Sequence, residues 1–121
     1  MTRTVHVLIV DDQEAFRAAA RMVVDLSDGF EVVGEADSGE EGIRLVGSLN
    51  PDLVLMDVKM GGIDGLEATR RIVAENAATR VVVLSTYDEY VQQALEAGAV
   101  AFISKSDFSP DALNVAWTEA P

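Results

Sequence analysis

Two adjacent carboxylates, Asp11 and Asp12, end an aliphatic run near the start of the chain. Three other polar residues follow later aliphatic runs in the same way: Asp57, Ser85 and Lys105. Two carboxylates about 4 Å apart repel each other by about 4 kcal/mol at an effective dielectric of about 20. A group of such acids therefore suggests a cation site, and a hydroxyl and an ammonium nearby suggest that an anion is bound as well.

Five apolar segments of strand length would position these residues, and the sequence predicts them at 5–10, 31–36, 52–57, 80–85 and 100–104. Three of them are nearly continuous aliphatic runs, as in strands buried on both faces of a parallel sheet. Helical patterns are predicted between them, at 13–27, 39–49, 65–76, 88–97 and 110–119. Strict alternation of strand and helix implies right-handed crossovers and a doubly wound α/β sheet. Ligands of such sheets bind beyond the carboxyl ends of the strands, where the polar residues fall.

Helix boundaries have local signals. Capping-box spacing at 38–41 and 64–67 predicts two helix starts, and Ser109 followed by Pro110 predicts a third. Gly98 and the Asn50-Pro51 step predict helix ends.

Composition excludes several classes of protein. The 121 residues suffice for one domain, and 49% of them are hydrophobic, without a run near the roughly 18 residues of a membrane span. The absence of cysteine excludes disulfides, thiolate metal sites and a cysteine nucleophile. A net charge of −12 argues against direct nucleic acid binding. We expect a cytoplasmic domain that does not associate with membranes.

The acids suggest a particular chemistry if their strands are neighbours. Oxygen-only ligands favour a hard divalent ion, Mg²⁺ or Mn²⁺. A carboxylate beside such an ion can act as a nucleophile towards phosphorus, while Lys105 and Ser85 bind oxygens of the transferred group.

Four stretches of the sequence resemble one family: DD after the first strand, DVKMGGIDGLEATRRI around Asp57, LSTYDEY after the fourth strand and AFISKS after the fifth. They are similar to the response-regulator receivers, or CheY-like domains, over essentially the whole chain. The similarity is greatest to receivers usually joined to a LuxR/NarL-like helix-turn-helix DNA-binding domain. It implies a flavodoxin-like (βα)5 fold with strand order 2-1-3-4-5, one receiver domain over residues 1–121 and no output domain in this chain.

The resemblance also implies roles for individual residues. The phosphoacceptor falls on Asp57 and the metal-binding acids on Asp11 and Asp12, with Asp12 in direct contact and Asp11 acting mostly through water. The third protein ligand would be the backbone carbonyl of Lys59. Switch residues map to Ser85 and Phe102, and the phosphate-pairing lysine maps to Lys105. Three residues flank the site and are candidates for modulating the access of water: Lys59, Thr86 and Tyr87.

Three positions depart from the family pattern. Gly61 stands where proline is common, so we expect a more mobile loop after Asp57. Lys105-Ser106 replaces a Lys-Pro step that is cis in many members, and we expect a trans peptide because a cis bond here costs about 2.5–4 kcal/mol. Phe102 replaces the frequent tyrosine and favours a packed, inward position, which argues against a simple in-and-out aromatic switch.

We therefore expect a phosphorylation-dependent switch of a two-component system, phosphorylated by a sensor histidine kinase or a small phosphodonor. Its output would be a changed surface over residues 88–119, a possible homodimer, and regulation of transcription through a DNA-binding domain of a longer protein. One alternative is a Mg²⁺-dependent aspartyl-phosphate phosphatase or phosphotransferase, but the place of its second acid holds Lys59. Another is a receiver-like interaction module that is never phosphorylated. Taken alone, Asp11 and Asp12 could also be simple helix-capping acids.

Overall fold

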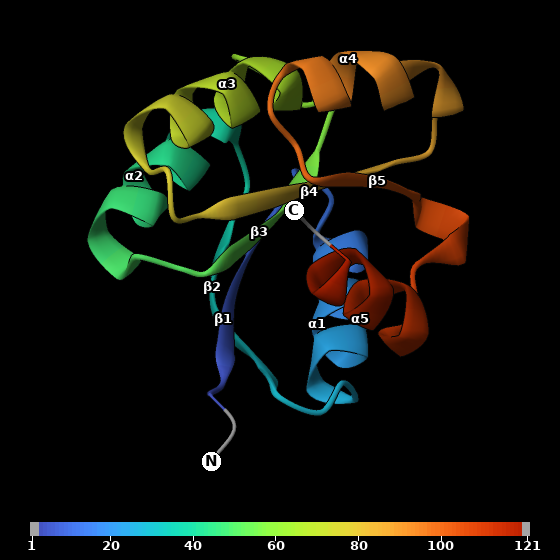
Figure 1. Cartoon of the computed structure of the whole chain (residues 1–121). Coiled ribbons are helices and arrows are strands. Elements are labelled where there is room, and N and C mark those ends of the chain that lie inside the picture. The colour runs from blue at the N-terminus through green and yellow to red at the C-terminus, as the bar shows by residue number, and fades with distance from the viewer. Residues whose placement is uncertain (1–2, 120–121) are drawn as a thin grey trace.

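Five parallel strands form the centre of the protein, and helices cover both faces of the sheet (Figure 1). The computed structural model describes residues 3–119. The strands are β1 Val5–Val10, β2 Phe30–Ala36, β3 Leu53–Asp57, β4 Arg80–Ser85 and β5 Ala101–Ser104. The helices are α1 Glu14–Asp25, α2 Gly39–Leu49, α3 Gly65–Glu75, α4 Val91–Glu96 and α5 Pro110–Thr118, with 3-10 turns η1 Asp88–Tyr90 and η2 Lys105–Asp107. The strand order β2-β1-β3-β4-β5 confirms the predicted doubly wound α/β fold.

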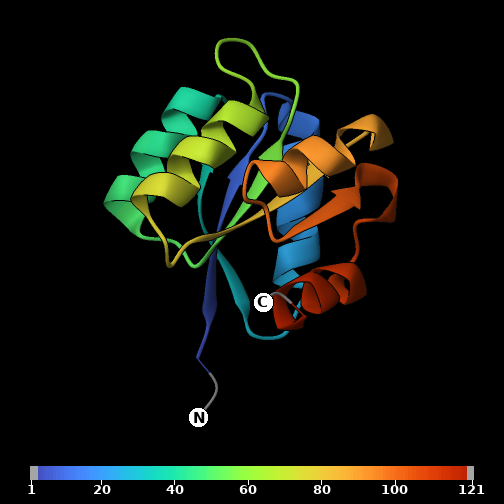
Figure 2. The same cartoon turned by 45° about the horizontal axis from the view of Figure 1, so that its top comes forward.

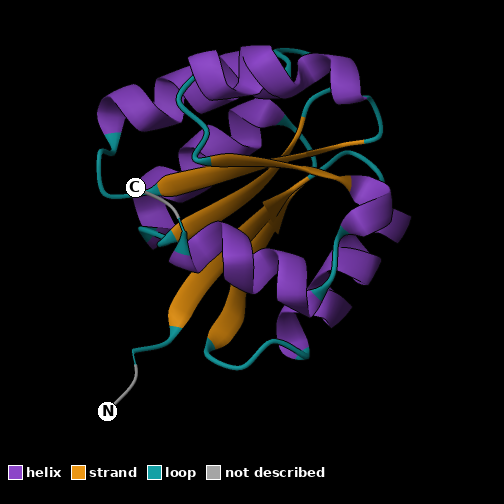
Figure 3. Ribbon diagram, turned by 45° about the vertical axis from the view of Figure 1, so that its right-hand side comes forward, coloured by secondary structure: helices purple, strands orange, loops and turns teal. Residues whose placement is uncertain are grey.

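The sheet separates two layers of helices (Figure 3), and a hydrophobic layer fills the space on each side of it. Leu8 and Val10 of β1 pack in the layer formed with α2, α3 and α4. Val7 and Ile9, which alternate with them, pack in the layer formed with α1 and α5. Each of these four side chains is 1% exposed or less, because the strand has no solvent-facing side. Burial on both faces explains why the strand is an uninterrupted aliphatic run.

The predicted helix caps are present. Oxygen atoms of Ser38, Asp64 and Ser109 accept a backbone N–H three residues further on, at 3.1, 2.9 and 3.1 Å. The reciprocal half of the first capping box is replaced within α2, where the Glu41 carboxylate pairs with Arg44. The start of each helix is thus fixed by one side-chain bond.

Two helix ends also follow their signals: Asn50, directly after α2, has a φ angle of 51°, and Gly98, two residues after the end of α4, has a φ angle of 109°. The prediction of one helix over 88–97 was wrong for its first turn. This turn is the 3-10 turn η1, and the six-residue helix α4 follows it. Tyr90 ends this turn with φ −92° and ψ 3°, and its ring packs against the hydrophobic layer. Between residues 3 and 119, no helix combines the length and the apolarity that crossing a membrane requires.

Candidate functional site

Residues from four strands meet at the carboxyl edge of the sheet. Parallel pairing sets Val10 of β1 opposite Met56 of β3, so the residues that follow them, Asp11 and Asp57, are neighbours. Similarly, β3 pairs with β4, and β4 with β5. The loop between β3 and α3 projects beside this edge, at the top of Figure 2.

Three carboxylates form a cluster here. Asp11, Asp12 and Asp57 each offer an oxygen, and these oxygens lie within 4.8 Å of one another. Asp11 and Asp57 are buried, at 1% and 7% exposure, whereas Asp12 is exposed. Burial, followed by the charge of Asp11, raises the pKa of Asp57 from 3.8 to about 6. A donor set of closely spaced carboxylate oxygens fits a hard divalent cation, which would relieve this repulsion.

Lys105 reaches the cluster from the far end of the sequence. Its Nζ lies 2.7 Å from Asp11 Oδ2 and 3.3 Å from Asp57 Oδ1. The ammonium also lies 4.3 Å from the centre of the Phe16 ring, and the lysine side chain is 14% exposed. This partly buried cation opposes the rise of the Asp57 pKa. An ammonium placed here can also pair with an anion bound to Asp57.

The two carboxylate oxygens of Asp11 accept hydrogen bonds from different partners. Its Oδ1 accepts the backbone N–H of Gln13 at 2.8 Å, next to the start of α1, while Oδ2 accepts from Lys105. Asp11 is therefore not a cap of α1, because its partner Gln13 is itself the N-cap residue of the helix, which has no side-chain capping hydrogen bond.

Ser85 is buried at the end of β4, at 1% exposure. Its Oγ accepts the backbone N–H of Tyr87 at 3.0 Å, which forms a local turn. Thr86, between them, is exposed. The Ser85 oxygen is the acceptor in this bond, so its O–H hydrogen is left free to donate to another acceptor.

Comparison with known proteins agrees with this geometry. The family model of the response regulator receiver domain matches residues 7–117. The chain belongs to this family. Response regulator GacA of Pseudomonas viridiflava is 44% identical over 104 residues, which are 84% of this chain and 48% of GacA. Transcriptional regulatory protein LiaR of Bacillus subtilis is 38% identical over 104 residues, 84% of this chain and 49% of LiaR. The receiver thus spans about half the length of these curated relatives.

Solved structures show the same fold. The receiver matches a LuxR-family two-component response regulator from Aurantimonas sp. with a TM-score of 0.86 and 31% identity, over 96% of this chain and 84% of the other. It matches the response regulator domain of Thermotoga maritima CheB with a TM-score of 0.79 and 33% identity, over 97% and 91% of the two chains. The flavodoxin-like, CheY-like fold is therefore shown.

Lys59 joins the two loops that flank the receiver's acidic cluster. Its ammonium lies 5.2 Å from the centre of the Tyr87 ring and 5.8 Å from that of Tyr90. The two rings pack edge to face, with centroids 6.3 Å apart. Tyr90 was missed by sequence reasoning because it lies inside a predicted helix, although its spacing of three from Tyr87 was a usable signal.

Phe102 lies away from the cluster. It pairs in register with Val83, is partly buried, and packs against the layer of α2, α3 and α4. Because the residue is only partly buried, the expected packed, inward position is only partly reached. The Lys105–Ser106 peptide is trans, as expected.

Proposed function

We propose that this receiver is a phosphorylation-dependent switch in which Asp57 accepts a phosphoryl group from a sensor histidine kinase or a small phosphodonor. The observation that carries the proposal is the convergence of three carboxylates and the Lys105 ammonium on one point. Isolated capping acids give no reason for a partly buried lysine that pairs with two carboxylates of the cluster.

The carboxylates of Asp11, Asp12 and Asp57, with the backbone carbonyl of Lys59, would hold Mg²⁺ or Mn²⁺. When bound, the ion supplies positive charge that offsets the negative charge of the transferring phosphoryl group. A carboxylate oxygen of Asp57 forms the bond to phosphorus as the bond from phosphorus to the donor breaks. Lys105 then pairs with a phosphoryl oxygen.

The new phosphoryl group would shift the protein between two conformations. It adds negative charge and acceptor oxygens, which attract the Ser85 hydroxyl and the Lys105 ammonium. Moving an equilibrium from 1:99 to 99:1 takes about 5.5 kcal/mol, and a few charged hydrogen bonds at about 1.5–3 kcal/mol each supply it. The β4–α4 loop and the surface of α4, β5 and α5 would change shape and regulate transcription through a DNA-binding domain outside this chain.

Phosphorylation would also promote a homodimer, through the surface of α4, β5 and α5 or through α1 and α5. Large apolar side chains are exposed on both surfaces: Met22 on α1 and Leu26 directly after it, and Val91 and Leu95 on α4. Light scattering with and without phosphorylation tests the dimer, and Leu26→Glu and Leu95→Glu distinguish the two surfaces.

Acetyl phosphate with Mg²⁺ tests the acceptor. We expect the intact mass of the protein to rise by one hydroxylamine-sensitive phosphoryl group, and Asp57→Asn to abolish this gain. Asp37→Asn is the control, because Asp37 is an exposed acid that follows β2. Equal labelling of Asp57→Asn would refute the assignment, while an unlabelled wild type that binds Mg²⁺ would favour the interaction module.

A further inference from the structure

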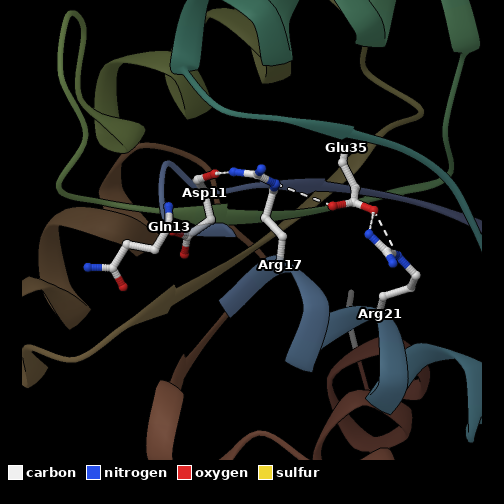
Figure 4. A network of polar contacts seen from close by, with 5 residues as sticks. All are labelled: Asp11, Gln13, Arg17, Arg21 and Glu35. Carbon is white, nitrogen blue, oxygen red and sulfur yellow. Dashed lines mark hydrogen bonds and ion pairs between the residues drawn. The ribbon is translucent and has the colours of Figure 1, made fainter. Parts of the chain in front are cut away.

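Arg17 of α1 lies beside Asp11 (Figure 4), although an arginine cannot itself hold the cation. Its Nη1 donates to the backbone carbonyl of Asp11 at 2.8 Å, and its Nε donates to Glu35 Oε1 at 3.3 Å. The side chains of Arg17 and Glu35 are only 18% and 24% exposed. The guanidinium is thus held between the backbone at the end of β1 and a carboxylate of the neighbouring strand β2.

The carbonyl that accepts from Arg17 belongs to the peptide group between Asp11 and Asp12. A peptide group is planar, so fixing the direction of this carbonyl also fixes the backbone N–H and Cα of Asp12. The Asp11 carboxylate is oriented by its own bonds to Gln13 and Lys105. The exposed Asp12 carboxylate depends instead on the position of its backbone.

We propose that Arg17 is a positioning residue for the cation site, because it holds the peptide plane that directs the Asp12 carboxylate towards the cation. Glu35 keeps the guanidinium in place. This inference rests on the proposed function, since it takes Asp11 and Asp12 as residues of the cation site. Groups that orient metal ligands from outside the coordination shell change metal affinity by about 10- to 100-fold when mutated.

Arg21 offers a matched control on the same helix. Its Nε donates to Glu35 Oε2 at 2.8 Å, and its side chain is 48% exposed. Replacement of either arginine by methionine removes one positive charge and one ion pair with Glu35, but only the change at Arg17 frees the Asp11 carbonyl. Loss of positive charge alone would strengthen cation binding. Charge and positioning therefore act in opposite directions at Arg17.

The experiment is a titration of the 121-residue chain with MgCl2, followed through backbone amide chemical shifts in NMR spectra. We expect Arg17→Met to raise the Kd for Mg²⁺ by about tenfold, and Arg21→Met to leave it within about twofold of wild type. An unchanged Kd for Arg17→Met, or an equal rise for Arg21→Met, overturns the proposal.

A second variant keeps the test decisive if the spectrum of Arg17→Met shows a loss of fold. Arg17→Lys retains the charge, but a single ammonium lacks the planar fork that reaches both Asp11 and Glu35, so we expect the Kd to rise by about threefold. A Kd equal to that of wild type would then overturn the proposal.

Labelling by acetyl phosphate on the same samples separates this inference from the proposed function. The labelling rate of Arg17→Met should recover at saturating Mg²⁺, because the defect lies in cation affinity. If wild type is labelled and Arg17→Met binds Mg²⁺ with a normal Kd, only the positioning role of Arg17 is overturned. A wild type that binds Mg²⁺ without labelling overturns only the proposed function, and a wild type that binds no Mg²⁺ overturns both.

Discussion

At the scale of single residues, the site is defined by an imbalance of charge. Three carboxylates lie close together with one ammonium beside two of them, and burial, followed by the charge of Asp11, raises the pKa of the Asp57 carboxyl. Lys105 reduces this imbalance but occupies positions next to Asp11 and Asp57 that a phosphoryl group would also approach. The lysine is therefore suited to exchange a carboxylate partner for a phosphoryl partner.

Lys105→Ala separates binding from switching. We expect the variant to bind Mg²⁺ with a Kd within about threefold of wild type, because removal of a competing cation offsets any loss of order. The phosphorylated variant should lack the changes of the α4 and β5 amide shifts that wild type shows. Ser106→Ala serves as a control, because Ser106 follows Lys105 in the sequence, is exposed, and has a side chain that hydrogen-bonds to Ser104 instead of the acids. Normal shifts in phosphorylated Lys105→Ala would exclude a relay role for the lysine.

Asp57→Asn should change how stability depends on pH in metal-free buffer. The pKa of Asp57 in the folded protein, about 6, lies above its ordinary value of 3.8, so the folded state binds more protons between these values. The free energy of unfolding of wild type therefore falls as pH rises through this window, by roughly 3 kcal/mol from this group. The free energy of unfolding of Asp57→Asn does not fall in this way, so the variant should be more stable than wild type at pH 8. The difference in stability should shrink towards pH 4.

Urea unfolding at several pH values in EDTA measures this difference. Asp37→Asn provides the comparison for loss of an exposed acid. A difference between wild type and Asp57→Asn that stays constant with pH would show that Asp57 titrates normally.

At the scale of elements, the β3–α3 connection depends on one glycine. A Cβ on Gly65 would lie 1.7 Å from the backbone oxygen of Asp57, and the Gly65 N–H donates to the Val58 carbonyl at 2.8 Å. The start of α3 therefore packs directly on the backbone of Asp57. No side chain fits between them.

Gly65→Ala should lower the free energy of unfolding by about 3 kcal/mol, the upper part of the usual range for overpacking. It should also slow phosphorylation, because the backbone that must move belongs to Asp57. Gly61→Ala is the matched control in the same loop, since no atom lies within 4 Å of its Cβ position. We expect it to raise stability by about 0.4–1 kcal/mol. Similar losses in both variants would contradict this explanation.

The elements that the sequence predicted well are those whose signal is local. The strands β1, β3 and β4 were predictable because side chains buried on two faces are nearly all apolar. The helix starts were predictable because Ser38 and Asp64 each bond within the first turn of their own helix. The 3-10 turn at the start of the helix expected at 88–97 was not predictable, because Tyr90 is held by tertiary packing. The Arg17–Glu35 pair was missed for the same reason, since no local pattern links residues on α1 and β2.

At the scale of the whole molecule, the parallel topology of the sheet brings residues that are far apart in the sequence together at one edge. Every strand enters the sheet from the same side, so residues 94 positions apart, Asp11 and Lys105, meet at one edge. Convergence of the acids was therefore predictable from the alternation of strands and helices. The partners of Lys105 were not predictable, because its ammonium could have bonded any of the three carboxylates.

Global stability should report binding at this edge. A ligand at about 100 times its Kd stabilises the folded state by about 2.7 kcal/mol, so saturating MgCl2 should raise the free energy of unfolding by about this amount at pH 8. Protons compete for the Asp57 carboxylate, whose pKa is about 6, so the gain at a fixed MgCl2 concentration should shrink below pH 6. NaCl at equal ionic strength is the essential control, because screening of a net charge of −12 also stabilises the chain. Equal stabilisation by the two salts would mean that the carboxylates bind no divalent ion specifically, whereas a gain lost in Asp57→Asn assigns the binding to this cluster.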